Sequence, residues 1–418
     1  MQEDGRQRTR FSGWLMLFVA GVAVFLSGPG QTYGVSPFVE PMLAELGWSR
    51  SLFSAAYSAG TLVSAGALLL VGRQIDRWGS RWVMALAALG FGVALLTMSA
   101  VTGALTLLVG FSLLRSCGSG VLTLGARTLV PQWFVRRRGR AFSLLGLAST
   151  LSLAAIPPVN EALIGAFGWR GAFRASALVM LLVLLPLVAL AVRNRPEDVG
   201  QHPDGERAPT GTAGGEGSAD EGATLKEALR TPAFWGLLGA SAVPSLVVTG
   251  LAFNQVAIFT DRGLPGTLAA ATFSVESAVG VPATLLAGWL VDRYPLRFIL
   301  AAGQVCLLVA MVVLLMSNSP AWAFGYSAWR GASSGLWMVA ADVAWPAWFG
   351  RKHLGSIRSV GFAVGVVGAA LGPLPFGFAY DLLGGYSPAI AALLVLPAVA
   401  TVAVLLAGEG RRGSRVVA

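Results

Sequence analysis

Charged side chains are scarce in this sequence. Asp, Glu, Lys and Arg make up 12% of its 418 residues, whereas hydrophobic residues make up 55%. Soluble globular chains carry roughly 25% charged residues. The composition therefore argues against an ordinary soluble domain and indicates a membrane protein.

Cysteine and histidine are also scarce, with two residues of each. Cys117 and Cys306 lie inside apolar runs, which argues against a disulfide framework and favours small packing residues. We find no metal-ligand cluster, no nucleophile triad and no phosphate-binding loop in the sequence. It therefore predicts no metal, no cofactor and no enzymatic activity.

Basic residues exceed acidic ones and give a formal net charge of +10. Such an excess could indicate nucleic-acid binding, but most of the Lys and Arg residues lie in links between apolar runs. Alternate links enriched in Lys and Arg are typical of the cytoplasmic side of a membrane protein. We therefore expect this chain to lie in a lipid bilayer and not to bind nucleic acid.

Twelve apolar runs are long enough to cross a bilayer, because a spanning helix needs about 20 apolar residues. The first run is too long for a signal-peptide core, so we expect an uncleaved helix. Twelve spans place both termini on one side, and the Arg-rich links make that side the cytoplasm. The runs are 13–36, 50–72, 82–101, 105–131, 141–163, 171–192, 233–258, 267–291, 297–316, 321–347, 357–379 and 386–407.

The longest polar segment, residues 194–231, is rich in Gly, Pro, Ala, Glu and Asp. It cannot bury enough apolar surface to fold, so we expect a disordered cytoplasmic linker with a short amphipathic turn at 225–229. The linker separates an N-terminal six-helix bundle, residues 1–193, from a C-terminal six-helix bundle, residues 232–408. A cytoplasmic tail, residues 409–418, follows.

Two motifs occur once in each half. GRQIDRWGSR at 72–81 matches GWLVDRYPLR at 288–297, with Gly, Asp, Arg and the last Arg at identical spacing. RSCGSGVLTLGARTLVPQWF at 115–134 matches RGASSGLWMVAADVAWPAWF at 330–349. A repeat of this length in the same hydropathic context predicts one six-helix unit used twice.

Across nearly its whole length the chain resembles the major facilitator superfamily, through the two loop motifs above. It is similar to monocarboxylate porters and oxalate–formate antiporters at Tyr33-Gly34-Val35 with LGWSR at 46–50, at Trp133-Phe134 with RRRG at 136–139, and at FGRK at 349–352. The resemblance implies alternating access between two bundles, with helices 1, 4, 7 and 10 around a central cavity. One feature departs from those carboxylate porters, which usually carry an arginine in helix 8. Here helix 8 contains Glu276 and no internal basic residue.

The loop motifs are candidates for control of the conformational balance. Asp76 can lie at the positive N-terminus of a helix in the opposite half, which the resemblance implies is helix 11. Glycines let helices approach closely, and the arginines can hold the loop. The alternative is a simple topology anchor that follows the positive-inside rule. The candidates are Gly72, Asp76, Arg77, Arg81, Gly288, Asp292, Arg293 and Arg297.

Ionisable residues inside spans cost about 2.5–3.5 kcal/mol each on insertion scales, so each is a functional candidate. Glu276 and Asp342 are candidates for proton coupling. Arg115 and Arg330, which match in the repeat, are candidates for anion binding. Arg127 lies closer to an inner end, where it could snorkel, and we group it with the conformational residues. The sequence leaves open whether Arg115 or Arg127 faces the cavity.

Uncharged polar residues inside spans add four candidates for substrate binding. Gln31 and Tyr33 follow Gly28-Pro29-Gly30, which predicts a bend in helix 1, and Asn254 and Gln255 lie in helix 7. Hydrogen bonds between helices are the alternative role for such residues.

The fold class that follows is an all-α membrane protein with twelve transmembrane helices in two six-helix bundles. We expect a secondary transporter that moves a small organic anion, a mono- or dicarboxylate, by proton symport or anion exchange, and works as a monomer in the inner or plasma membrane. Drug or metabolite efflux by proton antiport is one alternative, and a non-transporting membrane sensor is another. Substrate, direction and stoichiometry stay open.

Overall fold

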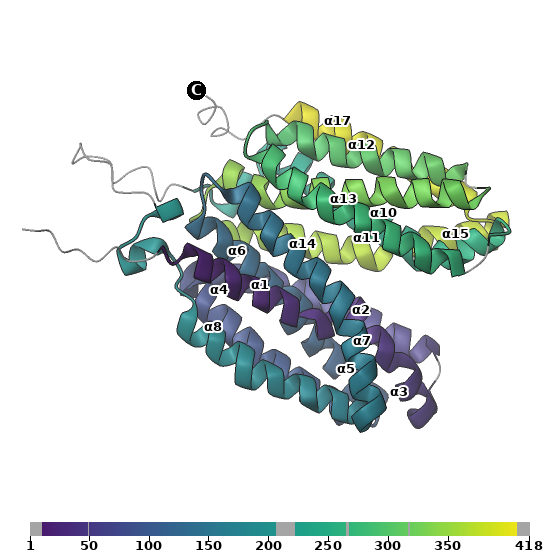
Figure 1. Ribbon diagram of the computed structural model, residues 1–418, viewed down its shortest axis with the longest axis horizontal. Coiled ribbons are helices and arrows are strands. Elements are labelled where there is room, and N and C mark those ends of the chain that lie inside the picture. The colour runs from purple at the N-terminus through teal and green to yellow at the C-terminus, as the bar shows by residue number, and fades with distance from the viewer. Residues whose placement is uncertain (1–10, 49, 206–221, 265–266, 317, 408–418) are drawn as a thin grey trace, which may run out of the picture.

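The computed structural model describes residues 11–48, 50–205, 222–264, 267–316 and 318–407. Within these ranges the chain forms helices and no strand, as the composition predicts. A backbone in lipid must satisfy its hydrogen bonds internally, and an α-helix does so within one segment. Figure 1 shows two groups of helices, α1–α8 and α10–α17, which we call the N-bundle and the C-bundle.

The N-bundle begins with a helix that the Gly28-Pro29-Gly30 segment interrupts, as the sequence predicts. Its longest helices, α4 and α7, each connect two spans. The elements are α1 (Gly13–Leu26), η1 (Gly28–Gly30), α2 (Thr32–Val35), η2 (Ser36–Phe38), α3 (Val39–Leu46), α4 (Arg50–Ser99), α5 (Ala104–Leu113), η3 (Leu114–Leu122), α6 (Thr123–Trp133), α7 (Arg138–Val179), η4 (Met180–Leu184) and α8 (Leu185–Ala191).

The C-bundle also contains eight α-helices, and in the described residues none of them contains a turn like those at Gly79 in α4 and Gly168 in α7. Its elements are α10 (Pro232–Asp261), α11 (Thr267–Val291), α12 (Leu296–Leu315), α13 (Pro320–Phe349), α14 (Leu354–Leu371), α15 (Leu374–Leu383), α16 (Ser387–Leu393) and α17 (Val395–Ala407).

The helices account for twelve spans. Among the described residues, nine helical stretches are long and apolar enough to cross a membrane. Two of them contain a glycine with a positive φ, Gly79 at 79° in α4 and Gly168 at 67° in α7, where the chain turns back and starts a second span. Positive φ favours glycine because it has no Cβ. The twelfth span is α13, whose thirty residues include Arg330 and Asp342.

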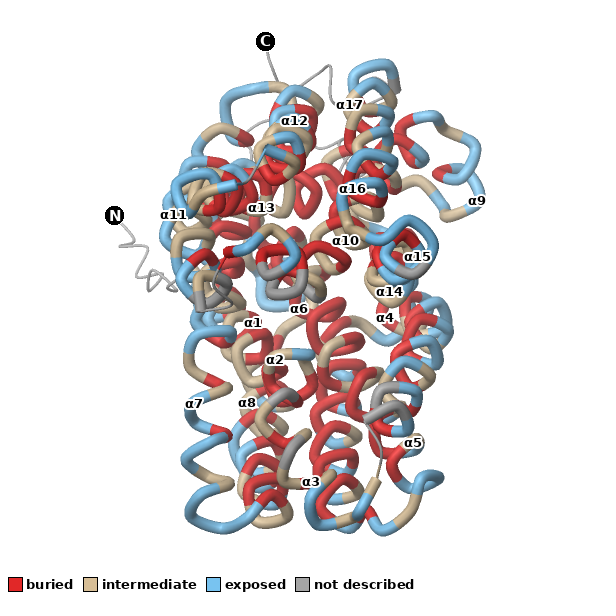
Figure 2. The backbone as a smooth tube through the Cα atoms, turned by 90° about the vertical axis from the view of Figure 1, so that its right-hand side faces the viewer, coloured by how far each residue is buried: buried red, intermediate tan, exposed pale blue. Residues whose placement is uncertain are grey.

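Large apolar side chains cover the outer surface of both bundles. Leu70, Leu190, Leu382 and Leu406 are each between 65% and 80% exposed. Figure 2 shows exposed residues on the outer sides of helices and buried residues on their inner sides. Such extensive apolar exposure marks a surface that contacts lipid. The fold is therefore that of a multi-pass membrane protein.

The two bundles meet mainly at one end of the molecule. There α4 packs against α14, and α7 packs against α11. Figure 1 shows the bundles close together at this end, where α1 begins and α17 ends, and diverging toward the end that carries α3 and α15. We call the first the motif end, because both loop motifs lie there, and the second the far end.

The expected linker, residues 194–231, is described only on either side of 206–221. At these two places the chain makes specific contacts that a disordered linker would not make. Asp204 accepts hydrogen bonds from the backbone N–H groups of Val135 and Arg136, at 2.9 and 2.7 Å, and Ala223 N–H donates to Phe349 O at 2.9 Å. Short helices form at Pro196–Val199 (η5), Pro203–Gly205 (η6) and Leu225–Ala228 (α9). Residues 206–221 and the tail, 409–418, lie outside the described residues.

Candidate functional site

Asp76 connects the two bundles at the motif end. Its Oδ1 accepts a hydrogen bond from the backbone N–H of Gly355 at 2.7 Å, and its Oδ2 accepts from the N–H of Ser356 at 2.8 Å and from the Ser356 hydroxyl. Gly355 and Ser356 are in the first turn of α14, where unpaired N–H groups and the helix dipole favour a carboxylate. The structure thus places Asp76 at the helix N-terminus in the opposite half, as expected from the sequence.

Asp292 repeats this contact in the other direction. Its Oδ1 accepts a hydrogen bond from the N–H of Gly139, in the first turn of α7, at 2.9 Å. Asp76 therefore holds α14 and Asp292 holds α7, which is the pairing that an internal repeat with two-fold symmetry produces.

Glycines bring the backbones together beside both carboxylates. A Cβ added at Gly72 would lie 2.5 Å from the carbonyl oxygen of Gly355, and one added at Gly288 would overlap the Ser143 hydroxyl. Real Cβ atoms do not approach other atoms so closely. Close packing in this state consequently requires glycine at both motif positions.

The arginines of the motifs contact the loops and their own bundles. The Arg81 side chain donates from Nε to Ala189 O at 2.8 Å, and its backbone N–H donates to Asn194 Oδ1 at 2.9 Å. Arg293 and Arg297 stack on the aromatic rings of Trp289 and Phe298. Arg77 lines a cavity at the motif end.

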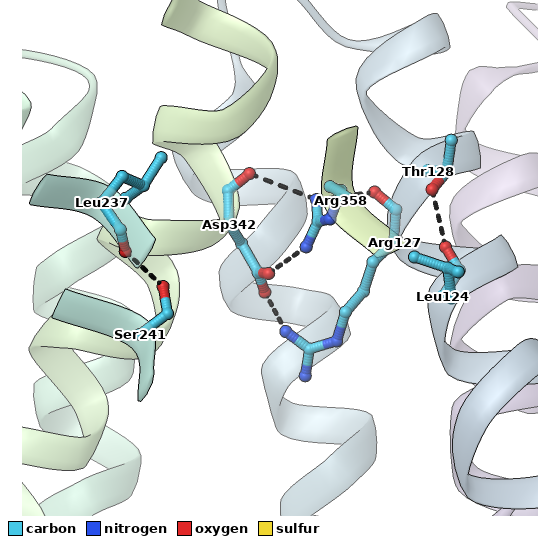
Figure 3. A network of polar contacts seen from close by, with 7 residues as sticks. All are labelled: Leu124, Arg127, Thr128, Leu237, Ser241, Asp342 and Arg358. Carbon is cyan, nitrogen blue, oxygen red and sulfur yellow. Dashed lines mark hydrogen bonds and ion pairs between the residues drawn. The ribbon is translucent and has the colours of Figure 1, made fainter. Parts of the chain in front are cut away.

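An ion-pair network closes the interface deeper in the molecule (Figure 3). The carboxylate of Asp342 in α13 pairs through Oδ2 with Arg127 of α6 and through Oδ1 with Arg358 of α14. Arg358 also donates to the carbonyl oxygen of Arg127 at 3.0 Å. One carboxylate thus serves two guanidinium groups, so the network carries one excess positive charge.

Burial makes this network costly to break. The Arg358 side chain is 1% exposed, and that of Asp342 is 9% exposed. Removal of one partner from a buried ion pair leaves an uncompensated charge and typically costs about 3–5 kcal/mol. Sequence analysis did not single out Arg358 as a candidate. Its position four residues into an apolar helix is the signal that could have singled it out.

A cavity of about 320 Å³ lies beside Arg127, between the first, fourth and fifth spans and α13. Gln31, Tyr33 and Arg127, three of the predicted candidates, line it together with the hydroxyl-bearing residues Thr123, Ser149 and Thr150. The sequence left open whether Arg127 snorkels or faces a cavity, and here its guanidinium pairs with Asp342 beside this cavity. The remaining lining residues are Val24, Ser27, Leu153 and Met338.

Arg115 lies in the interior of the N-bundle. It sits in η3, a π-helical segment that the sequence did not predict, and it is 9% exposed. Its Nη1 donates to Gly30 O at 3.0 Å, and its guanidinium lies 5.2 Å from the centre of the Tyr57 ring. Among the described residues, no carboxylate pairs with it.

Arg330, the repeat mate of Arg115, is bound within the C-bundle through both of its terminal guanidinium nitrogens, whereas its buried Nε has no hydrogen-bond partner among the described residues. Arg330 pairs with Glu276 of α11, and its Nη1 donates to Gln255 Oε1 and to the Tyr326 hydroxyl, both at 2.7 Å. Its side chain is 1% exposed. Glu276, the carboxylate expected in helix 8 (α11), therefore pairs with an arginine on the neighbouring helix α13. Sequence analysis missed Tyr326, although its position four residues before Arg330 places it on the same helix face.

The polar candidates of helix 7 make hydrogen bonds within the C-bundle. Gln255 is buried and bridges Arg330 to Thr272, whose hydroxyl accepts from Gln255 Nε2 at 2.7 Å. Asn254 donates to Gly250 O in its own helix at 2.9 Å. Gln255 thus makes the hydrogen bonds between helices that were the alternative role, whereas the bond of Asn254 stays within α10. Within the described ranges, no group of three or more His, Cys, Asp or Glu side chains could hold a metal ion.

Comparison with known proteins extends over nearly the whole chain. The uncharacterized MFS-type transporter YcxA of Bacillus subtilis is 24% identical over 422 residues, which cover 93% of each chain. Monocarboxylate transporter 11 of Mus musculus is 28% identical over 391 residues, which cover 90% of this chain and 83% of that protein. The structure of the proton:xylose symporter XylE matches with a TM-score of 0.74 at 14% identity, over 93% of this chain and 94% of that one. The Major Facilitator Superfamily matches residues 13–373, and the chain belongs to this family.

Proposed function

We propose that this protein transports a small organic anion, a mono- or dicarboxylate, by alternating access in the inner or plasma membrane. The observation that carries the proposal is the position of Arg127. It lines a cavity of about 320 Å³ and shares a single carboxylate with Arg358. The excess positive charge beside this cavity favours an anionic ligand.

The cavity suits a small polar solute. Its volume lies at the lower end of the range of small-molecule sites, roughly 300–1,000 Å³. The Gln31 amide can donate to the uncharged part of a hydroxy- or keto-acid, while the planar fork of Arg127 suits its carboxylate. The hydroxyls of Tyr33 and Thr123 already donate to Ser152 and to the backbone, so they are left as acceptors for a substrate hydroxyl. The relationship to monocarboxylate transporter 11 supports the same substrate class.

Alternating access follows from where the bundles touch. Their contacts concentrate at the motif end, at Asp76, Asp292 and the Asp342 network. In the proposed topology the motif end is the cytoplasmic side and holds both termini, so this conformation is closed toward the cytoplasm. Substrate entry from the far end, followed by loss of these contacts, would open the cavity to the cytoplasm.

Glu276 and Arg330 supply the proposed coupling site. A proton on Glu276 would break its pair with Arg330 and leave the guanidinium with Gln255 and Tyr326. Since the pair lies inside the C-bundle, a change there can alter the packing of α11 against α13 without touching the substrate. We assign the proton coupling of symport to this pair. When Glu276 cannot ionise, we expect anion exchange to be the transport mode that remains.

Uptake into proteoliposomes tests the proposal. Propionate, propionamide and propylammonium have similar sizes and differ in charge. We expect saturable uptake of the carboxylate alone among the three, increased by an inward proton gradient. Uptake that is driven by an outward proton gradient and prefers propylammonium would instead favour efflux by proton antiport. If no compound of a wide carboxylate panel is taken up, the result would favour a sensor.

A further inference from the structure

Half of the ten residues that line the proposed substrate cavity carry a hydroxyl group. They are Ser27, Tyr33, Thr123, Ser149 and Thr150. A hydroxyl has one proton to donate and two lone pairs that accept. What the cavity offers to a bound molecule therefore depends on where each of these protons is already used.

Three of the protons go to the backbone. Ser27 donates to the carbonyl oxygen three residues before it at 2.7 Å, Thr123 does the same at 3.0 Å, and Thr150 donates to the carbonyl oxygen four residues before it at 3.3 Å. Serine and threonine side chains bond back to the backbone in this way within helices. These three side chains are thus left with lone pairs alone for a ligand.

The proton of Tyr33 goes to Ser152. The two hydroxyl oxygens lie 2.9 Å apart. Ser152 is buried and gives its own proton to Phe25 O at 2.7 Å, so Tyr33 has to be the donor of the pair. Within the described residues, Ser149 is the one hydroxyl of the lining that has no hydrogen bond and can act in either sense. The other four hydroxyls of the lining can only accept from a ligand.

A lining of acceptors selects a molecule that donates. An unsubstituted carboxylate and a keto-acid have no proton to give, so either one would displace water and leave the oxygens of Tyr33, Thr123 and Thr150 without a partner. A site that binds a substrate hydroxyl discriminates against analogues that lack it, because a polar group left unpaired in a closed cavity costs free energy.

The donor also has to be uncharged. Arg127 is the one charged side chain of the lining that the described residues provide, and its partner Asp342 already pairs with two guanidinium groups. An ammonium group would lie beside this excess positive charge with no carboxylate to balance it. Hydroxyl groups supply protons without that cost.

We propose that the preferred substrate is a monocarboxylate with two or more hydroxyl groups, as in the sugar acids. Arg127 binds the carboxylate, and the oxygens of Tyr33, Thr123 and Thr150 accept from the hydroxyls. This assignment rests on the proposed function, because it takes the cavity as the transport site, and it narrows the class of substrate.

A series of three-carbon acids in proteoliposomes tests the assignment. Propionate, lactate and glycerate carry no, one and two hydroxyl groups, whereas pyruvate carries a carbonyl and alanine an ammonium group. We expect the KM for uptake to fall by about three- to tenfold with each added hydroxyl. Pyruvate and alanine should have KM values no lower than that of propionate.

Two variants connect this preference to the lining. Tyr33→Phe and Thr150→Val each remove one acceptor oxygen and should raise the KM for glycerate by about three- to tenfold, and that for propionate much less. A folding defect would reduce the uptake of both acids alike. Thr97→Val is the matched control, because Thr97 also donates to the carbonyl oxygen four residues before it, at 2.9 Å, but lies outside the cavity lining. Its KM values should equal those of wild type.

The outcomes separate this assignment from the proposed function. Equal KM values for propionate, lactate and glycerate would overturn the preference for hydroxyl groups and leave organic-anion transport standing, as would a lower KM for alanine than for glycerate. Uptake of none of the five acids would contradict the proposed function itself, and the assignment with it.

Discussion

The carboxylate of Asp342 pairs with the guanidinium of Arg127 across the interface of the two bundles. The two residues occupy matching positions of the internal repeat, one on α6 and the other on α13. A sequence duplication has thus produced a charge and its counter-charge at related positions, facing each other across the symmetry axis. Because Arg127 also lines the proposed substrate cavity, this pair connects that cavity to the closed interface at the motif end.

Asp342→Asn should destabilise the closed conformation. It leaves Arg127 and Arg358 buried without a carboxylate, which we expect to cost about 3–5 kcal/mol. The expected result is a lower thermal unfolding midpoint and faster labelling of cysteines placed at the motif end. The double variant Arg127→Gln/Asp342→Asn should recover part of the loss, because it removes an uncompensated charge. A simple sum of the two single effects would contradict the pair.

Asp76→Asn should open the motif end without unfolding the protein. The amide keeps one acceptor oxygen but loses the charge at the N-terminus of α14, an effect of about 0.3–2 kcal/mol in such positions, together with one charge-assisted hydrogen bond. Transport should fall while membrane insertion is retained. Glu45→Gln provides the matched control, since Glu45 pairs with Arg170 at the far end. If state-selective labelling of Asp76→Asn equals that of wild type, Asp76 has no conformational role.

Gly72→Ala should hinder closure through steric overlap. The added Cβ would lie 2.5 Å from Gly355 O, whereas a Cβ at Gly66, in the same helix, meets nothing within 4 Å. Gly66→Ala should therefore be neutral or stabilising, by up to about 1 kcal/mol of helix propensity. We expect the closed fraction, measured by cross-linking cysteines on α4 and α14, to fall only in Gly72→Ala. Similar cross-linking in both variants would show that the contact at Gly72 tolerates a methyl group.

Glu276→Gln should separate proton coupling from structure. The amide resembles the protonated acid, so proton-driven accumulation should disappear while exchange of substrate across the membrane survives. The measurements are uptake with a proton gradient and counterflow without one. Loss of both activities together with lower thermal stability would indicate that the pair with Arg330 is structural only.

Sequence predicted the fold because its signals are local or repeated. Apolar runs of spanning length give the helices, and two copies of the loop motif gave the contact of Asp76 with the helix of the opposite half. The π-helical η3 segment around Arg115 was not predicted because it packs against η1 and α4, and no local sequence pattern encodes such packing.

The candidate site was harder to predict than the fold. Its residues could be recognised as ionisable groups inside apolar runs, but their partners come from other helices. Whether Arg127 or Arg115 lines a cavity depends on helix rotation and on Asp342, far away in the chain. The same limit applies to Arg358, whose position near a helix start resembled a membrane-surface charge until α14 packed against α4 and α6.

The most direct test of the account is protection of the cavity by substrate. In a variant with Cys117 and Cys306 replaced by alanine, Thr150→Cys places a thiol in the cavity lining, and its rate of modification by a thiol reagent is measured with and without a transported carboxylate. The account predicts that the carboxylate slows modification, that Arg127→Gln removes this protection, and that Asp342→Asn, which frees Arg127 of its partner, retains or strengthens it. Equal protection in wild type and Arg127→Gln would contradict the assignment of Arg127 as the anion-binding group.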